Sequence, residues 1–237
     1  MPFRSLSEYK ETAQTLNCKG FELSWWQHKN AEAKTTILFI HGFPSASWDW
    51  HFQWHALKDQ YNLIAMDMLG YGISDKPVPY NYKLVEQAQF YVQLLESLDV
   101  KDCHILAHDY GDSVAQELLY LYHTKKTPFK INSVTFLNGG LFSEVHRPLL
   151  TQKLLKSVMG PILIPFLNRS SLKRSFENIF GPQTPPTVED IDVLWELLLY
   201  KQGTKAMPFI LQYLDERRVR REDWLNAMQQ TAVWGGR

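Results

Sequence analysis

An aspartate stands at the centre of the segment with the clearest chemical signature in this sequence. Residues 107–111 read Ala-His-Asp-Tyr-Gly and lie between an apolar run, CHILA, and a helical pattern. Small residues two positions before and two after the centre permit the sharp strand-to-helix turn called a nucleophile elbow. An aspartate at that centre can attack a saturated carbon without a base, giving an alkyl ester that water must then hydrolyse. A helix N-cap explains Asp109 equally well.

A second register of the same segment makes Ser113 the nucleophile of an ester hydrolase. Gly111 and Ala115 flank Ser113 with the same spacing. The elbow should follow its strand at once, however, and the apolar run ends at Ala107. The register centred on Asp109 is therefore favoured.

The segment His41-Gly42-Phe43-Pro44 follows another apolar run, TTILFI. A loop at the end of a strand can aim a backbone N–H at an oxyanion. We expect the amides of Phe43 and Tyr110, the residue after the nucleophile, to be the two donors. An ordinary strand-to-helix turn is the alternative. The glycine-containing loop at 67–77 lacks the spacing of a phosphate loop, which favours a structural role.

Strand-like and helix-like segments alternate through the first 140 residues. Apolar strands are expected at 20–26, 35–40, 61–68, 103–107 and 130–137, with helices at 48–57, 82–98 and 114–122. This alternation predicts an α/β fold with a mostly parallel sheet flanked by helices on both faces. After Gly140 the pattern is helical. We therefore predict a core over residues 1–140 and a helical cap region with the C-terminal part over 141–237.

Composition excludes several classes of protein. Lys and Arg together number 25, as do Asp and Glu, so the basic excess typical of a nucleic-acid binder is missing. No apolar run approaches the roughly 20 residues of a membrane span, and no secretory signal is seen. Two cysteines match neither a disulfide framework nor a zinc site. We expect a cytoplasmic protein with no metal, no organic cofactor and no nucleic-acid partner.

Taken together, these segments resemble the α/β-hydrolase superfamily. HGFP, D-x-x-G-x-G-x-S-x-x-P and H-D-Y-G, in this order, look like the epoxide hydrolase and haloalkane dehalogenase branch, whose nucleophile is an aspartate. Within that branch, residues 108–120, 138–140 and 146–150 are most similar to the mesoderm-specific transcript-like proteins. The resemblance implies a sheet core with a helical cap inserted after the sixth strand. Many dehalogenases hold halide with a tryptophan after the nucleophile, where this chain has Tyr110.

The resemblance also implies an acid and then a histidine after the cap. The eight histidines are at 28, 41, 51, 55, 104, 108, 123 and 146, so none follows the cap. At roughly 30 residues per strand–helix unit, about two units of the family fold are expected to be missing, as in a C-terminally truncated member. His108 is expected to point away from Asp109, its neighbour on the strand, and His146 to be a hinge residue of the cap.

Cap tyrosines are the remaining candidates for chemistry. In epoxide hydrolases, tyrosine hydroxyls from the cap polarise the epoxide oxygen. The resemblance therefore implies Tyr200 and Tyr213 as candidate acids, because both fall in expected cap helices. Aromatic residues at helical spacing are more often part of a core, which is the alternative for both.

The sequence thus predicts an epoxide hydrolase-like enzyme that forms an ester on Asp109 with a small apolar substrate. Without the late histidine, turnover is not expected to follow ester formation. The alternatives are a catalytically incompetent binding protein and a Ser113 esterase. Asp109 should lie in a strained turn at the C-terminal end of a central strand. Residues 130–137 should form the edge of the sheet, where unpaired backbone groups favour self-association.

Overall fold

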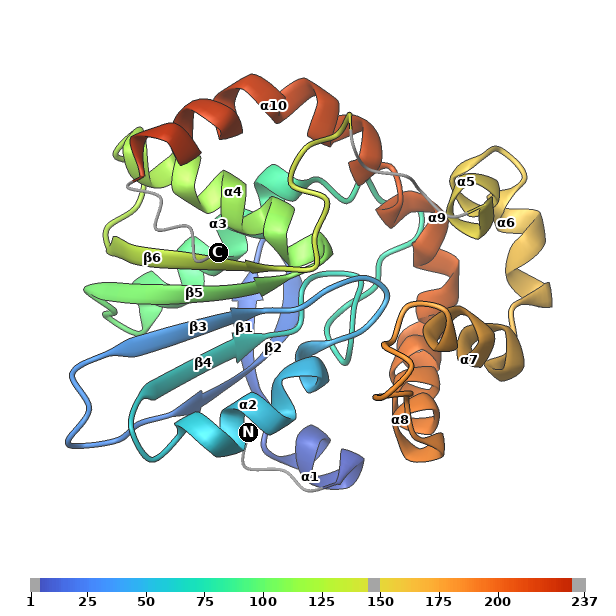
Figure 1. Ribbon diagram of the computed structural model, residues 1–237, viewed down its shortest axis with the longest axis horizontal. Helices are drawn as coiled ribbons and strands as arrows, with labels where there is room; N and C mark the ends of the chain where they lie inside the picture. Colours follow the sequence, from blue (N-terminus) through green and yellow to red (C-terminus); the bar gives the residue numbers. More distant parts are fainter. Residues whose placement is uncertain (1–4, 145–149, 232–237) are drawn as a thin grey trace.

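A six-stranded sheet forms the centre of the molecule (Figure 1). The computed structural model describes residues 5–144 and 150–231. The strand order is β1-β2-β4-β3-β5-β6. The strands β4, β3, β5 and β6 are parallel to one another, and β2 pairs antiparallel with both β1 and β4. The strands are β1 Gln14–Cys18, β2 Phe21–His28, β3 Thr36–Ile40, β4 Asn62–Met66, β5 Asp102–His108 and β6 Lys130–Leu137. The mostly parallel sheet is as predicted, and within the described residues β6 forms its edge.

Helices cover both faces of this sheet (Figure 1). One face carries α3 Leu84–Ser97, α4 Tyr110–His123 and α10 Tyr213–Gln230, and the other carries α1 Leu6–Glu11, η1 Ser47–Trp50 and α2 His51–Leu57. The remaining helices lie beyond one end of the sheet: α5 Leu150–Lys156, α6 Gly160–Leu163, η2 Ile164–Phe166, α7 Arg169–Glu177, α8 Val188–Leu199, η3 Tyr200–Ala206 and α9 Met207–Ile210. None of the helices described here combines the length and apolar character that crossing a bilayer requires.

The apolar strands explain why helices are needed on both faces. Along β3, Leu38 and Ile40 pack into the core under α3 and α4, whereas Ile37 and Phe39 pack into the core that contains Trp54 of α2. Successive side chains of a strand point to opposite faces, so a continuous apolar run must be covered twice.

Two elements at the start of the chain were not predicted from the sequence. The helix α1 and the strand β1 precede the first expected strand, and β1 forms an antiparallel hairpin with β2. Most side chains of β1 are exposed, so its sequence lacks the apolar run that identified the other strands. Pairing with β2 is what makes this segment a strand.

The last described helix returns to the core rather than staying with the cap. Arg220 of α10 donates three hydrogen bonds to the buried Glu117 of α4, at 2.8, 3.0 and 3.0 Å, and Trp224 Nε1 donates a fourth at 2.7 Å. The helical region that the sequence predicted over 141–237 therefore has two parts, a cap over the end of the sheet and a helix packed on α4.

Candidate active site

Asp109 occupies a strained turn directly after β5. Its φ and ψ are 53° and −111°, and α4 begins at the next residue. Non-glycine residues with such a backbone cost on the order of 1–3 kcal/mol and cluster at functional sites. The strand β5 pairs in parallel with β3 on one side and β6 on the other, so it is an interior parallel strand, as the sequence predicted. The strain at Asp109 is thus confirmed, and its role as nucleophile stays a prediction.

The small residue two positions after Asp109 has a steric cause. A β-carbon on Gly111 would lie 2.6 Å from the carbonyl oxygens of both Ile40 and His41. Real β-carbon contacts are not that short, so α4 can approach the end of β3 only with glycine here. The turn that displays Asp109 therefore depends on this residue.

The loop after β3 contacts the Asp109 carboxylate. The Phe43 N–H donates to Asp109 Oδ1 at 2.9 Å. Tyr110 is the first residue of α4, where an N–H has no acceptor inside the helix. The geometry at Phe43 agrees with the expected oxyanion donor, and the direction of the Tyr110 N–H stays a prediction.

His41 holds this loop in place. Its Nε2 accepts the Met68 N–H at 3.1 Å, and its Nδ1 lies 2.9 Å from the Gly42 carbonyl oxygen. Burial lowers the pKa of His41, which agrees with a neutral ring that donates through one nitrogen and accepts through the other. His41 is therefore a structural histidine.

The glycine-containing loop after β4 is also structural, as expected. The buried Asp67 carboxylate accepts the N–H groups of Ser47 and Ile73, each at 2.8 Å, and the Tyr9 hydroxyl at 2.6 Å. A β-carbon on Gly72 would lie 1.8 Å from that carboxylate. Asp67 thus fixes three segments around the end of the sheet.

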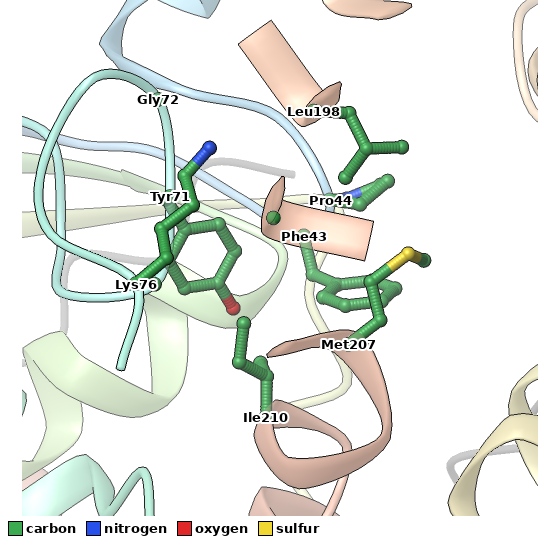
Figure 2. A pocket seen from close by; sticks show the side chains of 10 residues that line it. Phe43, Pro44, Tyr71, Gly72, Lys76, Leu198, Met207 and Ile210 are labelled. Carbon is green, nitrogen blue, oxygen red and sulfur yellow. The ribbon is translucent and has the colours of Figure 1, made fainter. Parts of the chain in front are cut away.

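The cap meets the core at a small crevice beside Phe43 and Pro44 (Figure 2). Leu198, Met207 and Ile210 form the cap side of this crevice. On the other side of this crevice the Lys76 ammonium donates to the carbonyl oxygens of Leu197 and Tyr200, at 2.7 and 2.9 Å, and burial lowers the pKa of Lys76 to about 7. These contacts fix the end of α8 against the core.

A cavity of about 430 Å³ opens in front of Asp109. Phe43 and Asp109 form its floor on the core side. Its other walls are mostly aromatic and aliphatic, and come from η1, α2, α7, the segment directly after α7, and α8: Trp48, Trp50, Phe52, Phe176, Ile179, Phe180 and Leu194. Ligand sites are typically apolar cavities of this size with a few polar groups, so this cavity suits a small apolar molecule.

The structure overturns the expected orientation of His108. His108, the last residue of β5, and Asp109, the next residue, line the same cavity. Side chains alternate only along a regular strand, and the positive φ of Asp109 ends that regularity. The ring of His108 lies beside Asp49, whose side chain also lines the cavity. Sequence reasoning missed Asp49, because nothing in SASWDW marks an acid that folds back toward residue 108.

The other candidates do not reach this cavity. Neither Tyr200 nor Tyr213 is among the residues that line it. The ring centroids of Tyr213 and Tyr110 are 4.7 Å apart, and the Tyr200 ring lies beside the ammonium groups of three lysines. Ser113 is buried in the first turn of α4 and is not at a strand-to-helix turn. His146 lies outside the described residues.

In residues 5–144 and 150–231, no three His, Cys, Asp or Glu side chains group as a metal site requires.

Known proteins resemble this chain along most of its length. A sequence model of the alpha/beta hydrolase fold matches residues 35–159. The mesoderm-specific transcript protein of Mus musculus is 36% identical over 236 residues, which are 97% of this chain and 70% of that protein. Epoxide hydrolase 4 of Homo sapiens is 30% identical over 112 residues, 47% of this chain and 30% of that protein.

Solved structures share the fold. The haloalkane dehalogenase DatA from Agrobacterium tumefaciens C58 superposes with a TM-score of 0.73 at 21% sequence identity, covering 93% of this chain and 75% of that one. At this identity the similarity concerns the fold alone.

Proposed function

Since this chain belongs to the α/β-hydrolase fold family, we propose that it is epoxide hydrolase-like and that Asp109 attacks a small apolar electrophile. The observation that carries the proposal is the strained Asp109 at the cavity floor, with one carboxylate oxygen held by the Phe43 N–H. The resemblance to an epoxide hydrolase supports the choice of substrate class.

The two oxygens of Asp109 have different environments. Oδ1 accepts the Phe43 N–H, and Oδ2 has no hydrogen-bond partner among the described residues. Oδ2 is therefore the attacking atom. It forms a bond to an epoxide carbon, the carbon–oxygen bond of the ring breaks, and the resulting alkoxide takes a proton from water. The product of this half-reaction is an alkyl ester on Asp109.

The ester leaves Oδ1 as its carbonyl oxygen, still beside the Phe43 N–H. When water adds to the ester, negative charge develops on that oxygen. A preorganised N–H at this position stabilises the charge, and removing one such donor typically costs about 10²–10³-fold in rate. The loop that places Phe43 therefore supports ester hydrolysis more than ester formation.

Covalent labelling tests the nucleophile. Incubation with styrene oxide should add one equivalent of the epoxide mass to the intact protein, and peptide mapping should place it on Asp109. Hydroxylamine should remove the adduct, because it cleaves esters and leaves alkylated thiols and imidazoles intact.

Asp109→Asn should abolish this adduct, and Asp112→Asn, on the next turn, is the matched control. A label on Ser113 would instead favour an ester hydrolase. No label on a folded protein would contradict the proposal and favour a binding protein without catalysis.

A further inference from the structure

His108 and Asp49 lie beside the proposed nucleophile in the same cavity. The Nδ1 of His108 is 3.8 Å from Oδ2 of Asp49. The Ser45 hydroxyl donates to the same carboxylate oxygen and also contacts the Gly42 carbonyl oxygen at 3.1 Å, so Asp49 is held by the loop that carries Phe43. A histidine and its carboxylate partner are therefore attached to the same loop as the oxyanion donor.

Gly42 brings the imidazole close to Asp109. A β-carbon at Gly42 would lie 2.9 Å from Nδ1 of His108 and also 2.9 Å from the β-carbon of Asp109. The ring and the nucleophile thus flank one glycine, with no side chain between them at that point. Both side chains also line the cavity, which leaves room for a water beside the imidazole and an ester on Asp109.

We propose that His108, positioned by Asp49, is the base that activates water against the Asp109 ester in this 237-residue chain. This inference rests on the function proposed above. A neutral His108 whose Nδ1–H faces Asp49 has a free lone pair on Nε2, which is the arrangement of a base oriented by a carboxylate. Hydrolysis of the ester needs a group that takes a proton from water, and a neutral imidazole can take it.

In the proposed step, His108 takes one proton from water and later gives it to the leaving oxygen. Water gives a proton to Nε2 of His108 as its oxygen bonds to the carboxyl carbon of Asp109. Charge collects on Oδ1 beside the Phe43 N–H. The bond from that carbon to the ester oxygen then breaks, and His108 returns the proton to the leaving oxygen. A diol departs, and the Asp109 carboxylic acid loses its proton to solvent.

The charged groups around His108 set its pH dependence. Burial by itself lowers the pKa of His108, but Asp49 through its hydrogen bond and charge, with Asp109 and Asp112, raises the pKa overall. His41, directly after β3, also interacts electrostatically with His108, and burial lowers the pKa of His41. The base works only when neutral, so ester hydrolysis should rise with pH through the His108 pKa and then level off.

The test measures how fast a preformed adduct disappears. Protein labelled with styrene oxide is freed of excess reagent, and intact mass follows the loss of the adduct from pH 5 to 9. His108→Gln should slow this loss by about 10²-fold or more, the usual value of a general base, while the adduct still forms. His104→Gln makes the same change at another position of β5 and is the matched control. It should leave the rate of adduct loss unchanged.

Two further variants test whether His108 acts as a base or has a purely structural role. Asp49→Asn should move the rise in the pH profile to lower pH, because the His108 pKa falls without the carboxylate. In His108→Ala, added imidazole should restore the loss of adduct, which a purely structural role would not allow. Asp49→Asn also carries the test if His108 variants do not fold.

The outcomes distinguish the two proposals. Loss of adduct at the wild-type rate in His108→Gln would overturn the inference and leave Asp109 as nucleophile. A wild-type adduct that never decays would also overturn the inference and leave Asp109 as nucleophile. Failure to form any adduct in folded wild-type protein would overturn the proposed function itself.

Discussion

Asp109 and Asp112 lie one turn apart at the start of α4, and their surroundings differ sharply. Asp109 opens into the cavity and accepts the Phe43 N–H. Asp112 is 1% exposed, and its Oδ2 has no partner among the described residues. Burial raises the pKa of Asp112 to about 8, although the Leu137 N–H counteracts the shift. These two neighbouring carboxyl groups therefore differ in character: Asp109 is the proposed nucleophile, and Asp112 is a buried core group with a raised pKa.

The raised pKa predicts a stability effect. A carboxyl that binds its proton more tightly when folded contributes stability below its ordinary pKa of 3.8, and this contribution is lost as pH rises through about 8. Urea denaturation midpoints of the wild type should therefore fall between pH 5 and pH 9 more than those of Asp112→Asn, which keeps the shape and does not titrate. Asp99→Asn, with an 82% exposed side chain, should follow the wild type. Equal pH dependence in wild type and Asp112→Asn would contradict this assignment.

At the scale of elements, the joint between β5 and α4 depends on close approach of two backbones. Gly111→Ala forces a β-carbon to within 2.6 Å of two carbonyl oxygens, and backbone cannot move aside as a flexible side chain can. We expect a loss of about 1–3 kcal/mol in the free energy of unfolding, measured in urea. Gly181→Ala meets only the Thr184 hydroxyl, at 3.3 Å, and should change little. An unchanged midpoint for Gly111→Ala would mean that the elbow is less tightly packed than described.

The edge strand β6 is the second element with a measurable consequence. Within the described residues it pairs only with β5, and most of its side chains are exposed. Unpaired N–H and C=O groups on such an edge can bind a second chain. Light scattering should therefore show concentration-dependent self-association, and Thr135→Lys should reduce it by placing a charge on the edge. Gln229→Lys on α10 adds the same charge elsewhere and should not. A monodisperse wild-type monomer would contradict the prediction.

For the whole molecule, the cavity exists because the cap is fixed over the end of the sheet. Residues of α7 and α8 complete the walls around Asp109, and Lys76 holds the end of α8 to the core. The core supplies the proposed nucleophile and oxyanion donor, and the cap supplies apolar walls. The groups that the proposed ester formation uses therefore come from both the core and the cap.

The second half-reaction should be slower than the first. With styrene oxide in excess, we expect a burst of about one equivalent of ester, followed by slow diol formation at the rate at which the adduct decays. The reason is that ester formation needs only the carboxylate, whereas hydrolysis also needs the proposed base, His108, whose Nδ1 lies 3.8 Å from Oδ2 of Asp49. Quenched-flow mass spectrometry and diol analysis would measure both phases. Rapid turnover without accumulated ester would contradict this order of rates.

The sequence by itself determined the features that depend on local spacing. The small residues at 107 and 111, the apolar strands and the loop HGFP were enough to predict the turn at Asp109, the layered α/β fold and the position of Phe43, because steric limits on a turn and the period of a strand act between near neighbours. The positions of β3 to β6 followed from the same patterns.

Only the tertiary structure decided which distant residues meet. Asp49 and His108 are 59 positions apart and come together because β3 and β5 are adjacent parallel strands whose C-terminal ends lie at one edge of the sheet. The orientation of His108 follows from the strained φ of the next residue, which strand periodicity does not anticipate. The hairpin of β1 with β2 and the return of α10 to α4 likewise depend on partners far along the chain. Such contacts are selected by packing of the whole molecule and leave no periodic signal in the sequence.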